Sequence, residues 1–236
     1  MVNSDDMLEQ GAIRAAVEYF DANPGIDVLY GACGFIDAAG KLFEVHPPRP
    51  WDLKLAVERC DHIIHQIASF MRRGIIERVD YVYPAWCHDH DLWLRIAVAG
   101  GRFGTTPRRL GLARIRAENL GNDPAIIVEG KVGLTRRFFA RPDLPAELRA
   151  LESRAMANAY LRCLYYVDPL RWKNWGIAWS LVRSAWAEDA GGSFGTLFSP
   201  RRGMVVFLAM WETVKFLRLE DAPIGRAISN RLWPVA

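Results

Sequence analysis

The chain has 236 residues, of which 51% are hydrophobic and 24% are charged, so its composition is that of a globular protein. This balance excludes an intrinsically disordered chain and a fibrous repeat. The net charge is +3, but the charges are unevenly distributed along the chain. Residues 1–100 carry 15 acidic and 9 basic side chains, and residues 101–236 carry 12 acidic and 21 basic ones. The two parts of the chain are therefore expected to meet different surroundings.

The compartment is predicted from cysteine usage and from the absence of targeting patterns. The four cysteines lie far apart and form no Cys-x-x-Cys pair, which favours a reducing compartment over a disulfide framework. The first residues show no basic segment followed by an apolar one, so we expect no signal peptide. No uncharged apolar run approaches the roughly 20 residues needed to cross a bilayer. We therefore expect a cytoplasmic protein.

The first 120 residues are predicted to mix helices and strands. Residues 9–22 have helical periodicity, with Ile13, Val17 and Phe20 on one apolar face, and Asn23-Pro24-Gly25 ends the helix. The elements that follow are a strand at 27–37, a return strand at 41–45, a proline-rich loop at 46–50, a helix at 52–60, a strand at 67–72, a helical turn at 73–79, a helix at 88–101, and strands at 102–106 and 109–116.

The chain beyond residue 122 is predicted to be helical throughout. Helical patterns cover residues 124–140, 145–167, 170–187 and about 203–219, and a Gly/Ser/Pro loop is expected at 191–202. We place a boundary near residue 120, between a mixed α and β domain at 1–120 and a helical extension at 121–236. The predicted class is therefore α/β followed by a helical region.

Two pairs of aspartates are candidates for chemistry. Asp5 and Asp6, in the stretch VNSDD, could supply hard oxygen ligands to Mg²⁺ or Mn²⁺, or could cap the helix that follows. Asp89 and Asp91, in CHDHDLWLR, stand at a predicted helix start and could serve as caps or as a general base. Each pair is a weak signal when it is taken alone.

The order of these motifs is more informative than either pair. VNSDD is followed by a helix, YGACGFID with a hairpin, HQIASFMRR, HDHDLWLRIAVAGGRF, and RRLGLARIR. This series resembles the family 2 glycosyltransferases, which are inverting enzymes with a GT-A fold, over about residues 2–120. The resemblance implies that Asp5 and Asp6 hold the metal of a sugar nucleotide, and that Asp89, with Asp91 second, is the catalytic base.

The resemblance also implies the partners. The donor would be a nucleoside diphosphate sugar and the acceptor a glycan or a lipid-linked molecule, with Mg²⁺ or Mn²⁺ as cofactor. The substrate contacts that it implies are Asn3, Asp37, Gln66, Trp93, Arg95 and Arg116. The family often ends its later strand with Arg-x-His, where this chain has Arg114-Ile115-Arg116. Family members carry further strands before the Asp motif, so we expect an N-terminally truncated enzyme that is inactive alone.

Other interpretations remain open. Cysteines and histidines at 60, 62, 65, 87, 88 and 90 could bind zinc, although their spacing matches no strong zinc pattern. A tryptophan stripe at 172, 175, 179 and 186, flanked by basic residues, suits contact with an anionic membrane, and core packing is the preferred alternative. No nucleic-acid motif accompanies the basic excess. The second function class is therefore a non-catalytic, membrane-peripheral helical module.

Overall fold

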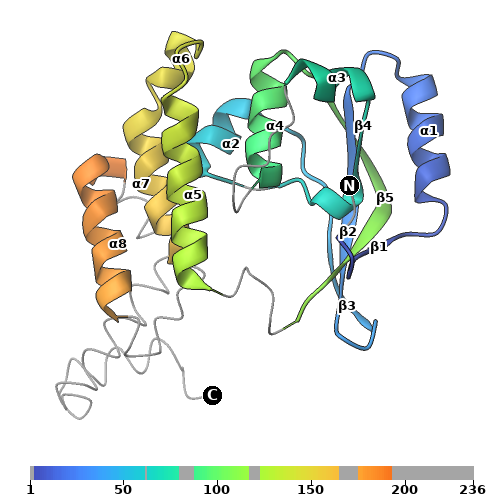
Figure 1. The fold of residues 1–236 in the computed structure, drawn as a ribbon, viewed down its shortest axis with the longest axis horizontal. Helices are drawn as coiled ribbons and strands as arrows, with labels where there is room; N and C mark the ends of the chain where they lie inside the picture. Colours follow the sequence, from blue (N-terminus) through green and yellow to red (C-terminus); the bar gives the residue numbers. More distant parts are fainter. Residues whose placement is uncertain (1–2, 62, 80–87, 117–122, 165–174, 193–236) are drawn as a thin grey trace, which may run out of the picture.

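The computed structural model describes residues 3–61, 63–79, 88–116, 123–164 and 175–192. These residues form a mixed α/β fold, in which helices lie on both faces of a mixed sheet (Figure 1). The expected α/β class is confirmed at this level. Within the described residues, no helix combines the length and the apolar character needed to cross a membrane.

The sheet is organised around strand β2 (Val28–Ile36). On one edge β2 pairs in parallel with β5 (Phe103–Arg114), and on the other it pairs antiparallel with β4 (Ser69–Met71) and β3 (Leu42–His46). The short strand β1 (Met7–Leu8) pairs antiparallel with the end of β5. Almost every residue of β2 is buried, as expected for a central strand that is covered on both faces.

The two strands predicted at 102–106 and 109–116 form one continuous strand, β5. Its register with β2 runs from Gly31 opposite Thr106 to Ala32 opposite Arg109, so a bulge absorbs the two residues between them. One of these residues is Pro107, which has no amide hydrogen to donate to a sheet ladder. The bulge therefore lets the strand pass through a proline that, in sequence, indicates a break.

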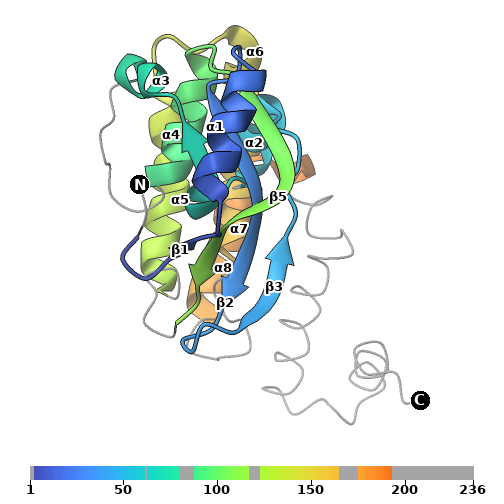
Figure 2. The ribbon, with the colours of Figure 1, turned by 90° about the vertical axis from the view of Figure 1, so that its right-hand side faces the viewer.

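Helix α1 (Ala12–Ala22) covers one face of the sheet (Figure 2). The apolar face predicted for it is wrong in part, because Ile13 and Val17 are 61% and 53% exposed. Ala12 and Ala16 are the residues that are buried against the sheet, and Phe20 packs beside them. Small side chains let the helix backbone approach the strands closely, and this turns the larger aliphatic residues outward.

On the opposite face lie α2 (Leu53–Arg59) and α4 (His88–Val98), with the short α3 (Arg73–Arg78) at one end of the sheet (Figure 1). The segment predicted as a strand at 67–72 divides into a 3-10 turn, η1 (Gln66–Ala68), and β4. The turn lies directly on β5. A Cβ atom on Gly111 would come within 2.3 Å of the carbonyl oxygen of Ile67, so this contact requires glycine.

The helical region forms a further layer beyond α2 and α4 (Figure 1). It contains α5 (Pro124–Phe139), α6 (Ala146–Arg149), α7 (Glu152–Cys163) and α8 (Trp175–Glu188). Ala56, Val57 and Leu94 of the first part share one apolar cluster with Leu134 and Phe138 of α5. Residues on the two sides of the predicted boundary therefore pack into a common core. The helix predicted at 203–219 lies outside the described residues.

Helix α8 carries two tryptophans of the predicted stripe, Trp179 and Trp186, on its exposed side. Its buried residues are Leu181 and Ala185, whereas Trp179 and Trp186 are 70% and 49% exposed. The alternative of core packing expected these tryptophans to pack against the helix at 203–219, which lies outside the described residues, so that packing stays a prediction. Their helix contacts α7 through the neighbouring aliphatic stripe, which is displaced around the helix from the tryptophans. Trp172 lies outside the described residues.

Candidate functional site

The Asp5–Asp6 loop is attached to the carboxyl end of β5. One carboxylate oxygen of Asp6 accepts a hydrogen bond from the backbone N–H of Arg114 at 2.9 Å, and the other accepts one from the side-chain amide of Asn3 at 2.9 Å. Helix α1 has Gly11 as its N-cap, with a φ of 74° and no capping side chain. The helix-cap interpretation of Asp5 and Asp6 is therefore wrong.

The side chain of Arg114 joins this loop to the end of β2. Its Nε donates to the carbonyl oxygen of Asp5 at 3.0 Å, and its Nη1 donates to the carbonyl oxygens of Asp37 and Ala38 at 3.0 and 3.2 Å. Sequence reasoning noted Arg114 only as part of Arg-Ile-Arg and missed this bracing function. The sequence carried no signal for it, because Asp5 and Arg114 are 109 residues apart and meet only in the folded sheet.

The environment of Asp6 disfavours its negative charge. Burial raises the pKa of Asp6 above its usual 3.8, and the nearby Asp5 carboxylate acts in the same direction. Hydrogen bonds from the Arg114 amide and from Asn3 oppose this rise in pKa without cancelling it. A cation bound beside Asp5 and Asp6 would relieve the cost of a charged carboxylate here.

The two adjacent carboxylates fit a magnesium or manganese ion of the kind that takes most of its ligands from water and phosphate. Each Asp6 oxygen accepts one hydrogen bond, from Asn3 or from the Arg114 amide, and a carboxylate oxygen has capacity for more. Within the described part of the chain, no group of three or more His, Cys, Asp or Glu side chains surrounds a common point. The protein's contribution to a metal in this loop would therefore be Asp5 and Asp6.

Asp89 and Asp91 both lie in the first turn of α4, where the helix dipole favours negative charge. Asp91 forms an ion pair with Arg95 at 2.8 Å, and both side chains are about one-sixth exposed, at 16% and 15%. Arg95 also donates to the carbonyl oxygen of Val79 at 2.8 Å. Asp89 accepts a hydrogen bond from the backbone N–H of His90 at 2.9 Å. The carboxylate of Asp91 therefore positions the side chain of Arg95.

The aspartate pairs are staggered along the sheet. Helix α4 has 11 residues and β5 has 12, which correspond to about 16 Å and about 40 Å. Because α4 leads directly into β5 and is shorter, the amino end of α4 lies beside the middle of β5 (Figure 1). Asp6, in contrast, accepts a hydrogen bond from Arg114, the last residue of β5. The joint role of the two pairs stays a prediction.

The remaining predicted substrate contacts occupy varied positions. Asp37 accepts a hydrogen bond from the backbone N–H of Lys41 at 2.9 Å and so shapes the β2–β3 turn. Gln66 belongs to η1, where its carbonyl oxygen accepts from Ser69. Trp93 has no exposed surface and packs in the core. Arg116 is exposed just after β5. A substrate contact at any of these residues stays a prediction.

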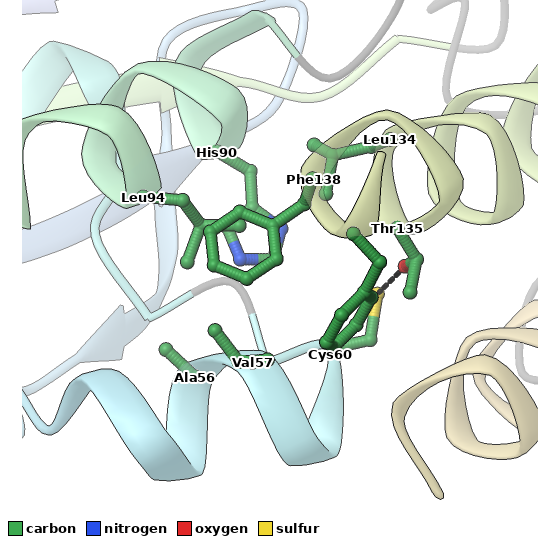
Figure 3. Close-up of a pocket in the computed structure, with 9 residues that line it drawn as sticks. Ala56, Val57, Cys60, His90, Leu94, Leu134, Thr135 and Phe138 are labelled. Atoms are coloured by element: carbon green, nitrogen blue, oxygen red, sulfur yellow. Dashed lines mark hydrogen bonds between the residues drawn. The ribbon is translucent and has the colours of Figure 1, made fainter. Parts of the chain in front are cut away.

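A small pocket lies between α2, α4 and α5 (Figure 3). Most of its lining is apolar, and its polar side chains are His90, Cys60 and Thr135. The Cys60 sulfur lies 3.8 Å from the Thr135 hydroxyl oxygen. Of the described residues in the proposed zinc set, Cys60 and His90 line this pocket, whereas His65 contacts His46 elsewhere. Residues 62 and 87 lie outside the described residues.

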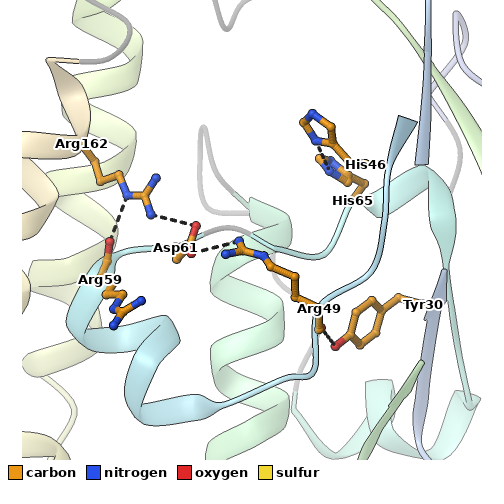
Figure 4. A network of polar contacts seen from close by, with 7 residues as sticks. All are labelled: Tyr30, His46, Arg49, Arg59, Asp61, His65 and Arg162. Carbon is orange, nitrogen blue, oxygen red and sulfur yellow. Dashed lines mark hydrogen bonds and ion pairs between the residues drawn. The ribbon is translucent and has the colours of Figure 1, made fainter. Parts of the chain in front are cut away.

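A polar network joins the α/β layer to the helical layer (Figure 4). Asp61 pairs with Arg49 at 3.0 Å and with Arg162 of α7 at 2.9 Å, and its side chain is only 17% exposed. The carbonyl oxygen of Arg49 accepts a hydrogen bond from the hydroxyl of Tyr30 on β2. A single carboxylate thus anchors the proline-rich loop to a helix that lies about 100 residues away in the chain.

The comparisons with known proteins add no assignment to this arrangement. No protein-family model matches the chain. No curated protein matches it either.

Proposed function

We propose that this chain is a family 2-type inverting glycosyltransferase with a GT-A fold, which transfers a sugar from a nucleoside diphosphate sugar to a glycan or lipid-linked acceptor. The observation that carries the proposal is the attachment of the Asp5–Asp6 loop to the carboxyl ends of β2 and β5 through Arg114. In α/β sheets, ligands bind outside the carboxyl ends of the parallel strands. The order of the sequence motifs supports the same function.

The residues divide between the two sides of the reaction. Asp5 and Asp6 would hold Mg²⁺ or Mn²⁺, which neutralises charge on the departing diphosphate. Asp89 takes the proton of the acceptor hydroxyl while that oxygen forms a bond to the anomeric carbon, and the bond from this carbon to the diphosphate oxygen breaks. Asp89 is preferred to Asp91 as the base because the resemblance places the base there first and because the Asp91 carboxylate is engaged by Arg95 at 2.8 Å.

The experiment distinguishes the metal-binding role of Asp5 and Asp6 from the role of Asp89 as the base. It measures donor binding and sugar transfer separately on the full chain. Binding of a panel of nucleoside diphosphate sugars is titrated with and without Mn²⁺, and transfer of radiolabelled sugar is measured in parallel. Asp5→Asn with Asp6→Asn should weaken Mn²⁺-dependent binding at least tenfold. Asp89→Asn should keep donor binding and lower any transfer by about 10²–10⁴-fold. Asp21→Asn, on the exposed side of α1, is the matched control.

The proposal fails if no donor binds in a Mn²⁺-dependent manner, or if the Asp5 and Asp6 variants bind as the wild type does. Donor binding without transfer would agree with the expectation that the chain is inactive alone. Clear transfer by the wild-type chain would contradict that expectation and support the enzyme assignment.

A specific observation favours a second candidate function, a non-catalytic module at the surface of an anionic membrane. On α8, Trp179, Trp186 and Ile177 are 70%, 49% and 42% exposed, and the exposed Arg183 lies on the same helix. Tryptophan beside basic residues is typical of membrane interfaces. Flotation with anionic liposomes should carry the wild-type chain upward and leave a Trp179→Ser, Trp186→Ser variant at the bottom. Equal flotation of both proteins would exclude a role for these tryptophans.

A further inference from the structure

Two histidines from separate segments face each other near the β2–β3 hairpin (Figure 4). Nδ1 of His46, the last residue of β3, lies 3.3 Å from Nε2 of His65, which immediately precedes η1. The other ring nitrogen of His46 lies 2.8 Å from a carboxylate oxygen of Glu44. The ring of Phe35 contacts both imidazoles edge-on, at centroid distances of 4.5 and 5.3 Å.

The separation of the two nitrogens fits a shared metal ion. Nitrogen ligands at about 2.05 Å from a tetrahedral Zn²⁺ lie about 3.3–3.4 Å apart. An ordinary hydrogen bond is shorter, because its donor and acceptor are usually about 2.7–3.2 Å apart. The observed 3.3 Å is therefore at the long limit for a hydrogen bond and close to one edge of a zinc tetrahedron.

The surroundings of His46 also favour ligation. In the tautomer that carries its proton on Nε2, His46 donates to Glu44 and the lone pair of its Nδ1 faces His65. A carboxylate on the far nitrogen is the usual outer partner of a metal-bound histidine, because it fixes the tautomer and makes the imidazole a stronger ligand. The Phe35 ring limits how far either imidazole can turn. One carboxylate and one aromatic ring therefore orient the pair.

We propose that His46 and His65 form a two-histidine binding site for Zn²⁺, separate from the Asp5–Asp6 loop. Imidazole nitrogen suits zinc, whereas the aspartate loop offers the hard oxygen ligands that suit magnesium or manganese. Within the described residues no third His, Cys, Asp or Glu joins the pair. Water would complete the coordination of an ion held by these two histidines. The site is half-exposed at His46, whose side chain is 46% exposed, and an ion can reach it from solvent.

The bound ion would link β3 to the start of η1 and so restrain the segment between them. The residues from 47 to 64 carry the proline-rich loop, α2 and Asp61, which connect the sheet to the helical layer. Zinc would therefore stabilise the folded chain, because it binds the paired histidines of the folded state in preference to the separated ones of the unfolded state.

The experiment titrates the full chain, first stripped with chelator, with ZnSO₄ alone and measures bound zinc by equilibrium dialysis. The wild type should bind one more Zn²⁺ per chain than a His46→Ala, His65→Ala variant. Glu44→Gln should weaken binding of that ion by about 10–100-fold. The control is Asp21→Asn, on the exposed side of α1, which should leave the zinc stoichiometry unchanged. His46→Gln serves as a second variant that keeps the size of the side chain.

Co²⁺ gives an independent readout, because tetrahedral Co²⁺ absorbs strongly in the visible range and hexahydrated Co²⁺ does not. The wild type should develop this absorption, and His46→Gln and His65→Ala should each lose it while keeping the wild-type circular dichroism spectrum. Equal zinc stoichiometry in the wild type and the double histidine variant would overturn the proposal. Loss of the histidine-dependent Co²⁺ absorption in an Asp5→Asn, Asp6→Asn variant would overturn the separation of the two sites.

Discussion

Replacement of Arg114 by alanine tests the bracing of the aspartate loop. The change removes three side-chain hydrogen bonds to backbone carbonyl oxygens, those of Asp5, Asp37 and Ala38, and a weaker one to the sulfur of Met7. It keeps the hydrogen bond from the backbone N–H of residue 114 to the Asp6 carboxylate. Asp6 should therefore remain attached to β5, while Asp5 and the β2–β3 turn lose their common anchor.

The expected loss of stability follows from these contacts. A hydrogen bond from a charged donor contributes about 1.5–3 kcal/mol, and a neutral one contributes about 0.5–1.5 kcal/mol. Arg114 is partly exposed and its three bonds share one side chain, so we expect a total loss of about 2–4 kcal/mol for Arg114→Ala. For a chain of this size, that loss lowers the melting temperature by about 5–10 °C.

Thermal and urea unfolding followed by circular dichroism measure the effect, and Mn²⁺ titration measures its consequence for the loop. Arg114→Lys should fall between wild type and alanine, because an ammonium group can satisfy part of the same set of acceptors. Arg14→Ala, on the exposed side of α1, is the control and should change stability by less than about 0.5 kcal/mol. If Arg114→Ala unfolds with the same midpoint as Arg14→Ala, the bracing argument is refuted.

Three further predictions concern the pH dependence and the packing of the sheet. Burial raises the pKa of Asp6 above 3.8, so the folded protein binds the carboxyl proton more tightly than the unfolded chain does. Protonated Asp6 therefore contributes to the free energy of unfolding. This contribution is complete below pH 3.8 and is lost as the pH rises through the raised pKa. Asp6→Asn should flatten this part of the curve of stability against pH, measured by urea unfolding. Gly111→Ala should cost about 1–3 kcal/mol because the added Cβ meets a backbone carbonyl. Gly74→Ala, in α3 with open space around it, should change stability by less than about 1 kcal/mol, and equal thermal midpoints for the two glycine variants would contradict the contact. Ala16→Leu should overpack the face of α1 that meets the sheet and cost about 1–3 kcal/mol, whereas the exposed Ile13→Lys should cost less than about 0.5 kcal/mol in the same thermal assay.

Much of the local structure was predictable because it depends on short-range periodicity. The strand at 27–37, the return strand at 41–45 and the helices at 52–60 and 124–140 agree with β2, β3, α2 and α5 to within one or two residues. Apolar runs of period 2 or 3.6 and the turn residues between them carry this information locally. The candidate aspartates were found in the same way, from residue type and position in the chain.

The choice of buried face was less predictable. In α1 the sequence favours the Ile13 stripe, and in α8 it favours the tryptophans, yet alanines and leucines make the contacts among the described residues. Hydrophobicity shows which side chains of a helix are the most apolar. Which face of the helix is buried depends also on the shape of the surface that the helix packs against. A close approach to a sheet requires small residues, and periodicity alone cannot show how close the approach will be.

The amino-acid sequence by itself determined the mixed α/β character of the first part, the helical character of the second, and the order of the aspartate motifs. Only the tertiary structure decided that Arg114 braces the Asp5–Asp6 loop, that Asp61 joins two layers, and that His46 meets His65. The contacts of Arg114 with Asp5, of Asp61 with Arg162 and of His46 with His65 each join residues that are 19 or more positions apart in the chain. Hydrogen bonds and ion pairs act over a few ångströms, so their partners become known only when the strands and helices are packed together.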